Sequence, residues 1–430
     1  MKLTHILFTI LFCCSMGILK GQDVLSISRC YELARANYPL IHQHGLIEQA
    51  EQFHLSNIGK SWLPQLAINA KASYQSDVTE LPFNRKQLSS LMPGANIPSL
   101  SKDQYQIVAQ VDQTIWDGGN ARSSRALTRA EATANKKALE SELYALNQRI
   151  NDLYFGCLLQ DELIHQNSLL QKDLQTNINR ITSMIRNGVA NQSDLESMQV
   201  ELLNAQQRAI ELKTGKKTFL QMLAAFIGRP ITEDYLLKVP DLPDTSTSSL
   251  INRPELQAFE ARDELLASRN RQLTAGLMPR FSAFVQGGFG RPALNMLSND
   301  FDPFYVAGVR LTWNLGKLYT LKNDRRTIEA NRQSLNVERE TFLFNTRLQL
   351  LQQDTEIQKM NDLIQADKEI IRLRNNIKKA AEVKLSNGVI AVTDLIREIN
   401  AEDQARQAAS THHIQHLKNS YDRIHTTNQQ

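Results

Sequence analysis

The sequence predicts a mainly α-helical chain with a smaller β part, in which long antiparallel coiled-coil helices are joined to four β-strands. Three observations predict this fold. A turn containing Asn-Gly occurs twice, at residues 186–195 and 386–395, each time between two long helical patterns. Spans without proline on either side keep the heptad-like spacing of a coiled-coil seam, and four segments alternate apolar and polar residues as strands do. Because each feature recurs about two hundred residues later, we predict an internal duplication.

The N-terminal residues have the features of an export signal. A lysine comes early, a short apolar run follows, and small residues end the segment. We expect a signal peptide over residues 1–21, because the apolar run is too short for a membrane anchor that crosses about 30 Å of hydrocarbon. Cys13 and Cys14 lack the small preceding residues of a lipidation site, so we expect no lipid anchor.

The first repeat is expected over residues 22–228. Its helical spacing continues to residue 62, with a restart at Pro39, and Leu63-Pro64 then ends it. From there the period changes to two, which predicts a β-hairpin at about 65–116.

After this hairpin the chain lacks proline for more than a hundred residues. The span from Gly119 to Asn187 predicts one continuous helix of about 100 Å. The turn at 186–195 follows, and a second helix ends at Gly228-Arg229-Pro230. A helix of this length is too long for a globular domain. The length therefore favours an elongated coiled coil over an ordinary bundle.

A linker at 229–251, with three prolines and a Ser/Thr run, separates the repeats. The second repeat, 252–430, has a β-hairpin at about 280–314 and its own turn at 386–395.

The residues of each turn have a physical reason to be there. Asn-Gly ends a helix, because glycine accepts the left-handed conformation of a C-cap and asparagine tolerates it. Ser193 or Thr393, or the aspartate beside each, is expected to accept from the free amides that begin the next helix.

Strands of about ten residues with one apolar face fit a β-barrel that spans a bilayer. Four strands cannot close, because their edges would leave unpaired amides in hydrocarbon, so the chain is expected to oligomerise. The side chains expected to face the lumen are mixed in charge and predict no ion preference: Lys71, Gln106, Gln110, Asp112 and Arg310.

The composition excludes some partners and chemistries. The formal charge is only +4 over 430 residues, with no basic run interleaved with aromatics, so we expect no nucleic acid partner. The sequence contains no His-Glu-x-x-His motif, no Cys-x-x-Cys pair and no phosphate-binding glycine loop, so no enzyme activity, cofactor or metal is predicted. Cys30 and Cys157 are interpreted as small buried thiols, although a disulfide between them stays open.

Two local patterns each have a structural and a functional interpretation. Gly287-Gly288-Phe289-Gly290 is glycine-rich, but no helix start follows it, so we interpret it as a loop rather than a phosphate-binding site. His412 and His416 are four residues apart, with His413 beside them, a spacing that can hold a metal on one helix face. With no acidic neighbour in sequence, we favour a solvated helix face.

The order and spacing of several short motifs resemble the TolC family of outer-membrane efflux proteins over essentially the whole chain after the signal. The resemblance implies a homotrimer with a twelve-stranded β-barrel in outer-membrane lipid and an α-helical tunnel in the periplasm. It also implies passive conduction, with a periplasmic adaptor (membrane fusion protein) and an inner-membrane pump that deliver drugs, metals or polypeptides. The motifs are Leu25-Ser26-Ile27, Asn37-Tyr38-Pro39, Leu63-Pro64, Trp116-Asp117-Gly118-Gly119 and the Asn-Gly-Val turn with Ser193-Asp194-Leu195, together with the second copies in the other repeat.

In this family the turns are tips that meet the adaptor and form the aperture. Asp394 matches an acidic aperture position, but Arg397 stands where a second acid is expected, and Glu398 would face elsewhere on the helix. These three residues are the possible aperture set. The resemblance assigns adaptor docking to Asn187, Gly188, Val189, Ser193, Asp194, Asn387, Gly388, Val389 and Thr393.

Two alternatives stay open. A type I protein-secretion duct uses the same kind of tunnel and cannot be separated from a drug-efflux duct by these residues. A soluble periplasmic coiled-coil adaptor or scaffold shares the signal and the helical hairpins, but it would not need two hairpins of long strands with continuous apolar faces.

Overall fold

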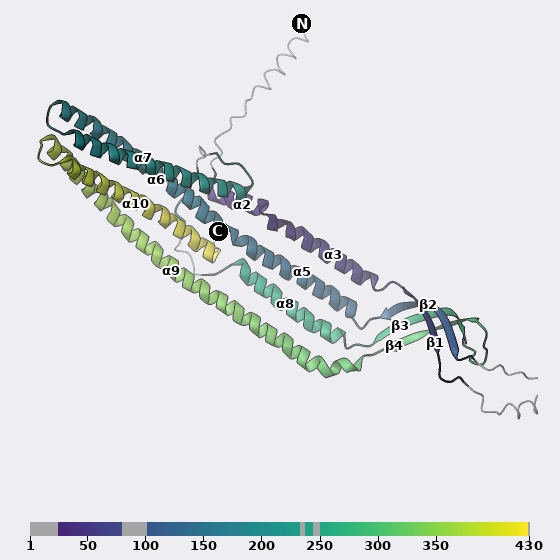
Figure 1. Cartoon of the computed structure of the whole chain (residues 1–430). Coiled ribbons are helices and arrows are strands. Elements are labelled where there is room, and N and C mark those ends of the chain that lie inside the picture. Colours follow the sequence, from purple (N-terminus) through teal and green to yellow (C-terminus); the bar gives the residue numbers. More distant parts are fainter. Residues whose placement is uncertain (1–24, 80–100, 233–236, 244–249, 429–430) are drawn as a thin grey trace, which may run out of the picture. The chain divides into compact units, whose positions relative to one another are not determined.

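A computed structural model describes residues 25–79, 101–232, 237–243 and 250–428 (Figure 1). The expected signal peptide, most of the expected loop between the first two strands and part of the expected linker lie outside these residues. The described chain is mostly helical and contains one antiparallel sheet. The prediction of a mainly α-helical fold with a smaller β part is thereby confirmed.

The chain divides into two compact units, each built from separate segments of sequence. Unit 1 comprises residues 1–43, 138–256 and 340–430, and unit 2 comprises 44–137 and 257–339. Each unit therefore contains parts of both expected repeats.

Capping interactions mark the start of one helix of unit 1 and the end of another. The Ser26 hydroxyl accepts from the amide of Arg29 at 3.3 Å and starts the first helix. Gly228, with φ +69°, ends α7, and the Asn37 amide donates to the carbonyls of Ala225 and Phe226 in its last turn. The elements that lie wholly or mostly in unit 1 are α2 (Ile27–Asn37), η1 (Pro39–His42), α6 (Leu146–Arg186), α7 (Gln192–Ile227), α9 (Leu318–Ser386) and α10 (Val392–Thr427).

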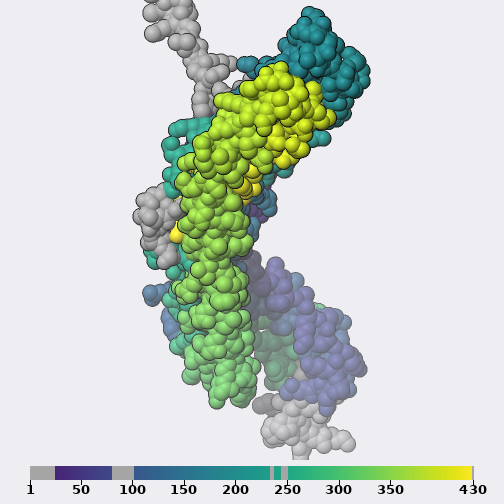
Figure 2. Space-filling model, turned by 90° about the vertical axis from the view of Figure 1, so that its left-hand side faces the viewer, coloured from purple at the N-terminus to yellow at the C-terminus, as the bar shows by residue number. Residues whose placement is uncertain are grey.

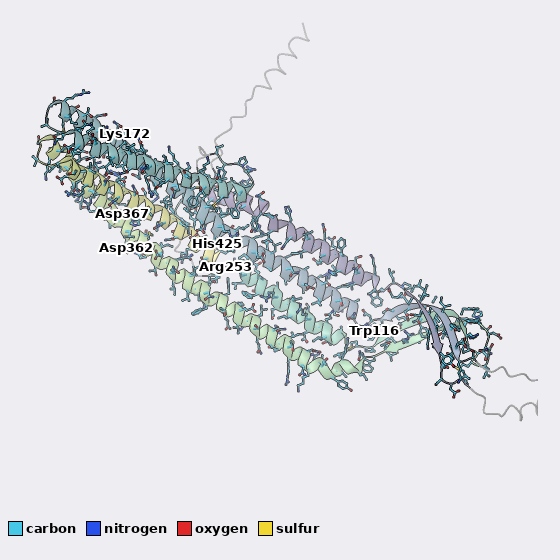
Figure 3. The ribbon with its side chains drawn as sticks, viewed as in Figure 1. Trp116, Lys172, Arg253, Asp362, Asp367 and His425 are labelled. Carbon is cyan, nitrogen blue, oxygen red and sulfur yellow. The ribbon has the colours of Figure 1, made fainter. Side chains whose placement is uncertain are left out.

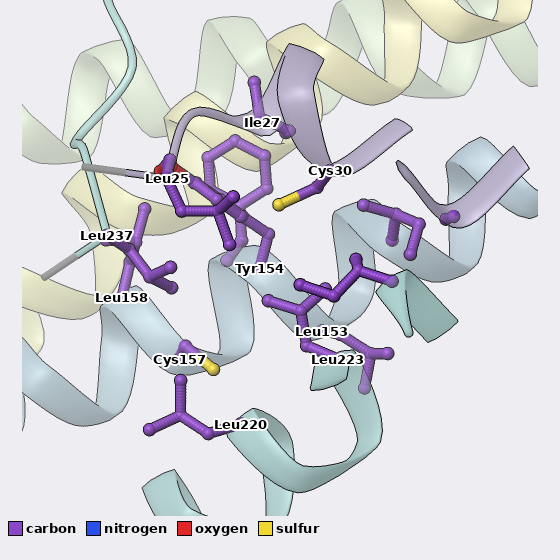
Figure 4. Close-up of a cluster of buried hydrophobic side chains, with 14 of the residues drawn as sticks. Leu25, Ile27, Cys30, Leu153, Tyr154, Cys157, Leu158, Leu220, Leu223 and Leu237 are labelled. Carbon is purple, nitrogen blue, oxygen red and sulfur yellow. The ribbon is translucent and has the colours of Figure 1, made fainter. Parts of the chain in front are cut away.

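One hydrophobic core of unit 1 gathers around α2, α6 and α7 (Figure 4). The buried Tyr154 hydroxyl lies 2.8 Å from the carbonyl oxygen of Leu25 and 2.7 Å from that of Lys238, which fastens two extended segments to α6. Cys30 and Cys157 are free and buried in this cluster, and burial raises the pKa of each thiol to about 12. The interpretation as small buried thiols is confirmed.

A second core of unit 1 lies between the helices that lead into the two turns. Ile181 and Met198, from α6 and α7, are fully buried together with Leu395 and Ile399 of α10. The apolar stripes that restart after each turn therefore pack together, which holds the two helical hairpins side by side.

Unit 2 contains a four-stranded sheet with the order β1-β2-β3-β4, so that β1 and β4 are its edges. Its strands pair in sequence order and are all antiparallel. The elements that lie in unit 2 or reach into it are α3 (Gln43–Lys60), β1 (Gln65–Tyr74), β2 (Asp103–Trp116), α5 (Asn120–Tyr144), α8 (Pro254–Ala275), β3 (Arg280–Arg291), β4 (Asp302–Thr312), η2 (Leu315–Lys317) and the first part of α9.

The interpretation of Gly287–Gly290 as a loop is wrong, because β3 runs through these residues. Gly288 faces Phe304 across the strands, and a Cβ at residue 288 would lie 2.8 Å from that ring and 2.6 Å from the carbonyl oxygen of Ile107. The glycine here leaves room for an aromatic side chain of β4.

The helix expected from Gly119 to Asn187 is interrupted. It consists of α5 and α6, with a break at Ala145, beside the place where the Tyr144 ring stacks on His425 of α10 at 4.3 Å. Its counterpart α9 runs without interruption for 69 residues, enough for about 100 Å of helix. Among the described helices, none is both long enough and apolar enough to cross a bilayer.

Candidate functional site: two turns and an exposed sheet

Both turns have the same backbone geometry. Gly188 has φ +72°, its amide donates to the carbonyl of Ile185 at 3.0 Å, and the amide of Val189 donates to that of Met184 at 2.9 Å. This pair of hydrogen bonds around a left-handed glycine is a Schellman motif, which satisfies the last carbonyls of α6.

The second turn repeats the motif after α9. Gly388 has φ +69°, and its amide donates to Leu385 at 2.9 Å while that of Val389 donates to Lys384 at 2.9 Å. A Cβ at Gly188 or Gly388 would have no heavy atom within 4 Å. Backbone conformation, rather than space, therefore requires glycine at these positions.

The aspartates, not the hydroxyl residues, cap the helices that follow the turns. Asp194 accepts from the amide of Asn191 at 3.1 Å, and Asp394 accepts from the amide of Ala391 at 3.3 Å. Ser193 and Thr393 are exposed. Both aspartates thus have a structural role that is independent of any gate.

The turns present an exposed apolar residue at the same position. Val189 is 60% exposed and Val389 is 68% exposed, although a hydrophobic contact back to the helix commonly accompanies this motif. Asn187 and Asn387 are exposed beside them. The tips are therefore small surfaces made of an amide, a glycine and a branched apolar side chain.

The possible aperture residues differ in their surroundings. Arg397 is largely exposed and lies 3.5 Å from Asp394 and 3.3 Å from Glu398. Glu398 is mostly buried and lies 3.5 Å from Arg374 of α9. The structure thus places Glu398 against a neighbouring helix, while Asp394 forms an ion pair with Arg397.

A buried charged network links three helices of unit 1. The Lys378 ammonium of α9 lies 2.8 Å from Asp173 of α6 and 3.3 Å from Glu402 of α10, and Arg406 also pairs with Glu402. Next to Glu402, burial raises the pKa of Asp403 to about 6, while Gln407 donates to its carboxylate at 2.5 Å. The sequence provided no signal for this network, because its members are far apart along the chain.

The solvated-face interpretation of the histidines is wrong for two of the three. His412 Nδ1 lies 2.7 Å from Asp367 of α9, and His416 is buried, which lowers its pKa. His413 is exposed. Figure 3 shows Asp367 on α9; it is 45 residues before His412, so sequence proximity could not reveal it. Among the described residues no three His, Cys, Asp or Glu side chains are placed to hold a metal together.

One face of the sheet in unit 2 is apolar and open. The strand register aligns apolar residues into rows across all four strands, for example Leu66, Val111, Val285 and Ala307. Large members of this face are strongly exposed. They include Leu66 (69%), Ile68 (68%), Ile107 (52%), Val285 (54%), Tyr305 (78%) and Val309 (80%). We call this surface the apolar sheet face.

The other face holds all five residues expected to face a lumen. Arg310 lies 3.4 Å from Asp112 and 4.7 Å from the ring centroid of Phe284. Phe284 and Phe304 also lie on this side. Phe284 is paired with Asp112 of β2, and Phe304 is paired with Gly288, which is itself paired with Val108 of β2. This face is therefore mixed rather than uniformly polar.

Aromatic rings lie at both ends of the apolar sheet face. Trp116, labelled in Figure 3 at the end of β2, has its ring 5.8 Å from that of Phe281. At the opposite end of the strands Phe289 stacks on Phe301 at 5.9 Å, and Tyr105 lies 6.3 Å from Phe301. From Tyr105 to Trp116 the strand covers about 36 Å.

The described chain resembles solved outer membrane channels. It matches the Vibrio cholerae outer membrane protein VceC with a TM-score of 0.66 at 13% identity, covering 93% of this chain and 95% of that one. It matches the Campylobacter jejuni CmeC outer membrane channel with a TM-score of 0.65 at 13% identity, covering 93% and 85%. It matches the open state of the Neisseria gonorrhoeae MtrE outer membrane channel with a TM-score of 0.64 at 16% identity, covering 93% of this chain and 88% of that one.

At these identities the structural matches establish a shared fold. No curated protein sequence matches the chain. The family model of outer membrane efflux proteins matches residues 30–229, which include the first β-hairpin and the first turn. These comparisons confirm the resemblance stated from the motifs: the chain is similar to outer membrane efflux proteins in sequence over residues 30–229 and to outer membrane channels in fold.

Proposed function

We propose that the protein is the outer-membrane channel subunit of a tripartite efflux system and conducts its cargo passively. The observation that carries the proposal is the apolar sheet face. A contiguous apolar surface of this kind is unfavourable in water and marks a contact with a membrane or another protein. At the strand tilt of 35–45° that is common in membrane barrels, about 36 Å of strand gives a band about 25–30 Å tall. Aromatic rings at both ends of that band fit the two membrane interfaces.

We infer that three copies close one twelve-stranded barrel, because β1 and β4 leave unpaired edges that cannot remain open in hydrocarbon. Apolar side chains also lie exposed on one side of several helices; Figure 2 shows such an uncovered side of α9. Neighbouring copies would bury these side chains and complete an α-helical tunnel. They include Leu46 and Phe53 of α3, Leu203 and Ile210 of α7, and Phe344 and Leu351 of α9.

The two turns are proposed as the tips that dock a periplasmic adaptor, with an inner-membrane pump supplying the energy. Their shared Schellman geometry and their exposed Val189 and Val389 support both this role and the proposed duplication. Asp394, Arg397 and Glu398 are proposed to lie near the aperture. Because Asp394 is paired with Arg397, this aperture would not be a ring of free carboxylates.

The first test is reconstitution of the purified protein into planar bilayers, with its oligomeric mass measured in the same preparation. We expect a trimer with a small, stable single-channel conductance and no partner protein required. A monomer that neither inserts nor conducts would contradict the barrel proposal, and a periplasmic coiled-coil scaffold would then explain the sequence better.

The docking role is tested by Gly188→Val and Gly388→Val, which strain a left-handed backbone without a steric clash. The matched control is Gly45→Val, because Gly45 of α3 is equally open but helical. Co-purification of a periplasmic adaptor from the native host should fall for the turn variants and not for the control, with trimer yield unchanged. Normal adaptor recovery with the turn variants would show that the turns are not docking tips.

A further inference from the structure

The end of the apolar sheet face that lies farthest from the helices carries a row of three side chains across β2, β3 and the approach to β4. Tyr105 is in register with Arg291, and the Arg291 guanidinium lies 5.5 Å from the Tyr105 ring centroid and 5.3 Å from that of Phe301. Phe301 also stacks on Phe289, which belongs to the apolar sheet face. Arg291 and Phe301 therefore extend this face beyond the sheet.

These same two residues begin and end the connection between β3 and β4. Arg291 forms an ion pair with Asp103, and Asn299 accepts from the amide of Ser101 at 2.9 Å. The connection is thus fastened to the start of β2 at two points. Its ends are held on the apolar side of the sheet rather than on the side of Asp112 and Arg310.

The connection itself is unusually apolar for an exposed segment. Between Pro292 and Phe301 the charged side chain is Asp300. Leu294 is 61% exposed, Met296 63%, Leu297 47% and Phe301 46%. Exposed apolar residues that continue an apolar face mark a contact with another apolar phase.

We propose that residues 292–301 form a lipid-contacting collar, which rests on the headgroup–hydrocarbon boundary of the bilayer rather than folding over the mouth of the channel. This inference rests on the proposed function, since it extends the surface that would face lipid. The contact is apolar rather than electrostatic, because Arg291 is already paired with Asp103 and the segment adds only a negative charge. Neutral phospholipid therefore suffices as the partner.

Site-specific quenching tests the collar in the mature protein, which lacks the expected signal peptide with Cys13 and Cys14. A cysteine is introduced by Leu297→Cys, labelled with a polarity-sensitive fluorophore, and the protein is reconstituted into phosphatidylcholine vesicles with brominated acyl chains. Burial and a thiol pKa of about 12 keep Cys30 and Cys157 from reacting. Ile107→Cys reports the apolar sheet face, and Gln106→Cys, one residue away, reports the opposite face.

We expect the label at residue 297 to be quenched by bromolipid nearly as strongly as that at residue 107, and to be protected from aqueous iodide relative to that at residue 106. If the label at residue 107 is quenched by bromolipid while the label at residue 297 is quenched only by iodide, the proposal of a lipid-contacting collar is wrong and the channel proposal stands. If residue 107 is not quenched by bromolipid either, the membrane barrel itself fails. Quenching at residue 297 that requires anionic phosphatidylglycerol would overturn the apolar contact.

Discussion

Asp403 shows how burial changes the behaviour of a single carboxyl group. It is 9% exposed on α10 beside the buried Glu402, and burial raises its pKa from 3.8 to about 6. The folded state therefore favours the protonated form. Stability from this group is fully present below pH 4 and is lost as pH rises through 6, a change of about 3 kcal/mol.

Asp403→Asn should remove this pH dependence, because asparagine resembles the neutral acid and still accepts from Gln407. We expect the variant to match the parent near pH 4 and to have a higher melting temperature at pH 8. The control is Asp362→Asn, since Asp362 also accepts from a glutamine four residues away, at 3.0 Å, but is exposed (Figure 3). An equal gain at pH 8 in both variants would contradict the role of burial.

At the scale of the element, the Lys378 network joins helices from both hairpins. Lys378 of α9 is 12% exposed and contacts Asp173 of α6 and Glu402 of α10. Replacing it with methionine leaves Glu402 buried with only Arg406 as a cation partner, and we expect a loss of about 2 kcal/mol or more. Hydrogen exchange should become faster in α6 and α10 near these residues.

The matched change is Arg372→Met on the same helix. Arg372 pairs with Glu369 at a fully exposed position, where an ion pair adds little to stability, so exchange in α6 and α10 should stay at the parental rate. If Lys378→Met also leaves hydrogen exchange in α6 and α10 at the parental rate, the network does not hold the hairpins together.

How much of this fold could be predicted from the sequence depends on how local the controlling interaction is. The two turns were found because a left-handed backbone requires glycine, and the strands because side chains alternate between faces. The pairing of His412 with Asp367, and of Lys378 with Asp173, depends on which helices become neighbours, so no local pattern indicated it. The break at Ala145 lies beside the stack of Tyr144 on His425, and Gly288 lies against Phe304 of the next strand, and neither partner is close in sequence.

At the scale of the whole molecule, both surfaces proposed for function are ones that the isolated chain leaves unsatisfied. Most of the apolar sheet face is left exposed by the described chain, and the edges of β1 and β4 are unpaired. The turns differ, because their backbone groups are internally satisfied by the Schellman bonds. On the proposed function, the sheet would gain stability from lipid and from neighbouring copies, whereas the turns would meet a partner without a need for further backbone hydrogen bonds.

This difference predicts opposite results for the same substitution at adjacent residues of β1. Ile68 lies on the apolar sheet face, paired with Ala109, and Asn69 lies on the other face, paired with Val108. A lysine near the bilayer midplane on the lipid side costs about 2–4 kcal/mol per copy, whereas the lumen side tolerates it. Three copies in one barrel multiply that cost, so Ile68→Lys should sharply lower the trimer recovered from outer membranes, while Asn69→Lys should assemble and shift only ion selectivity. Equal assembly of both variants would mean that the apolar sheet face does not contact lipid, whatever the conductance of the parent protein.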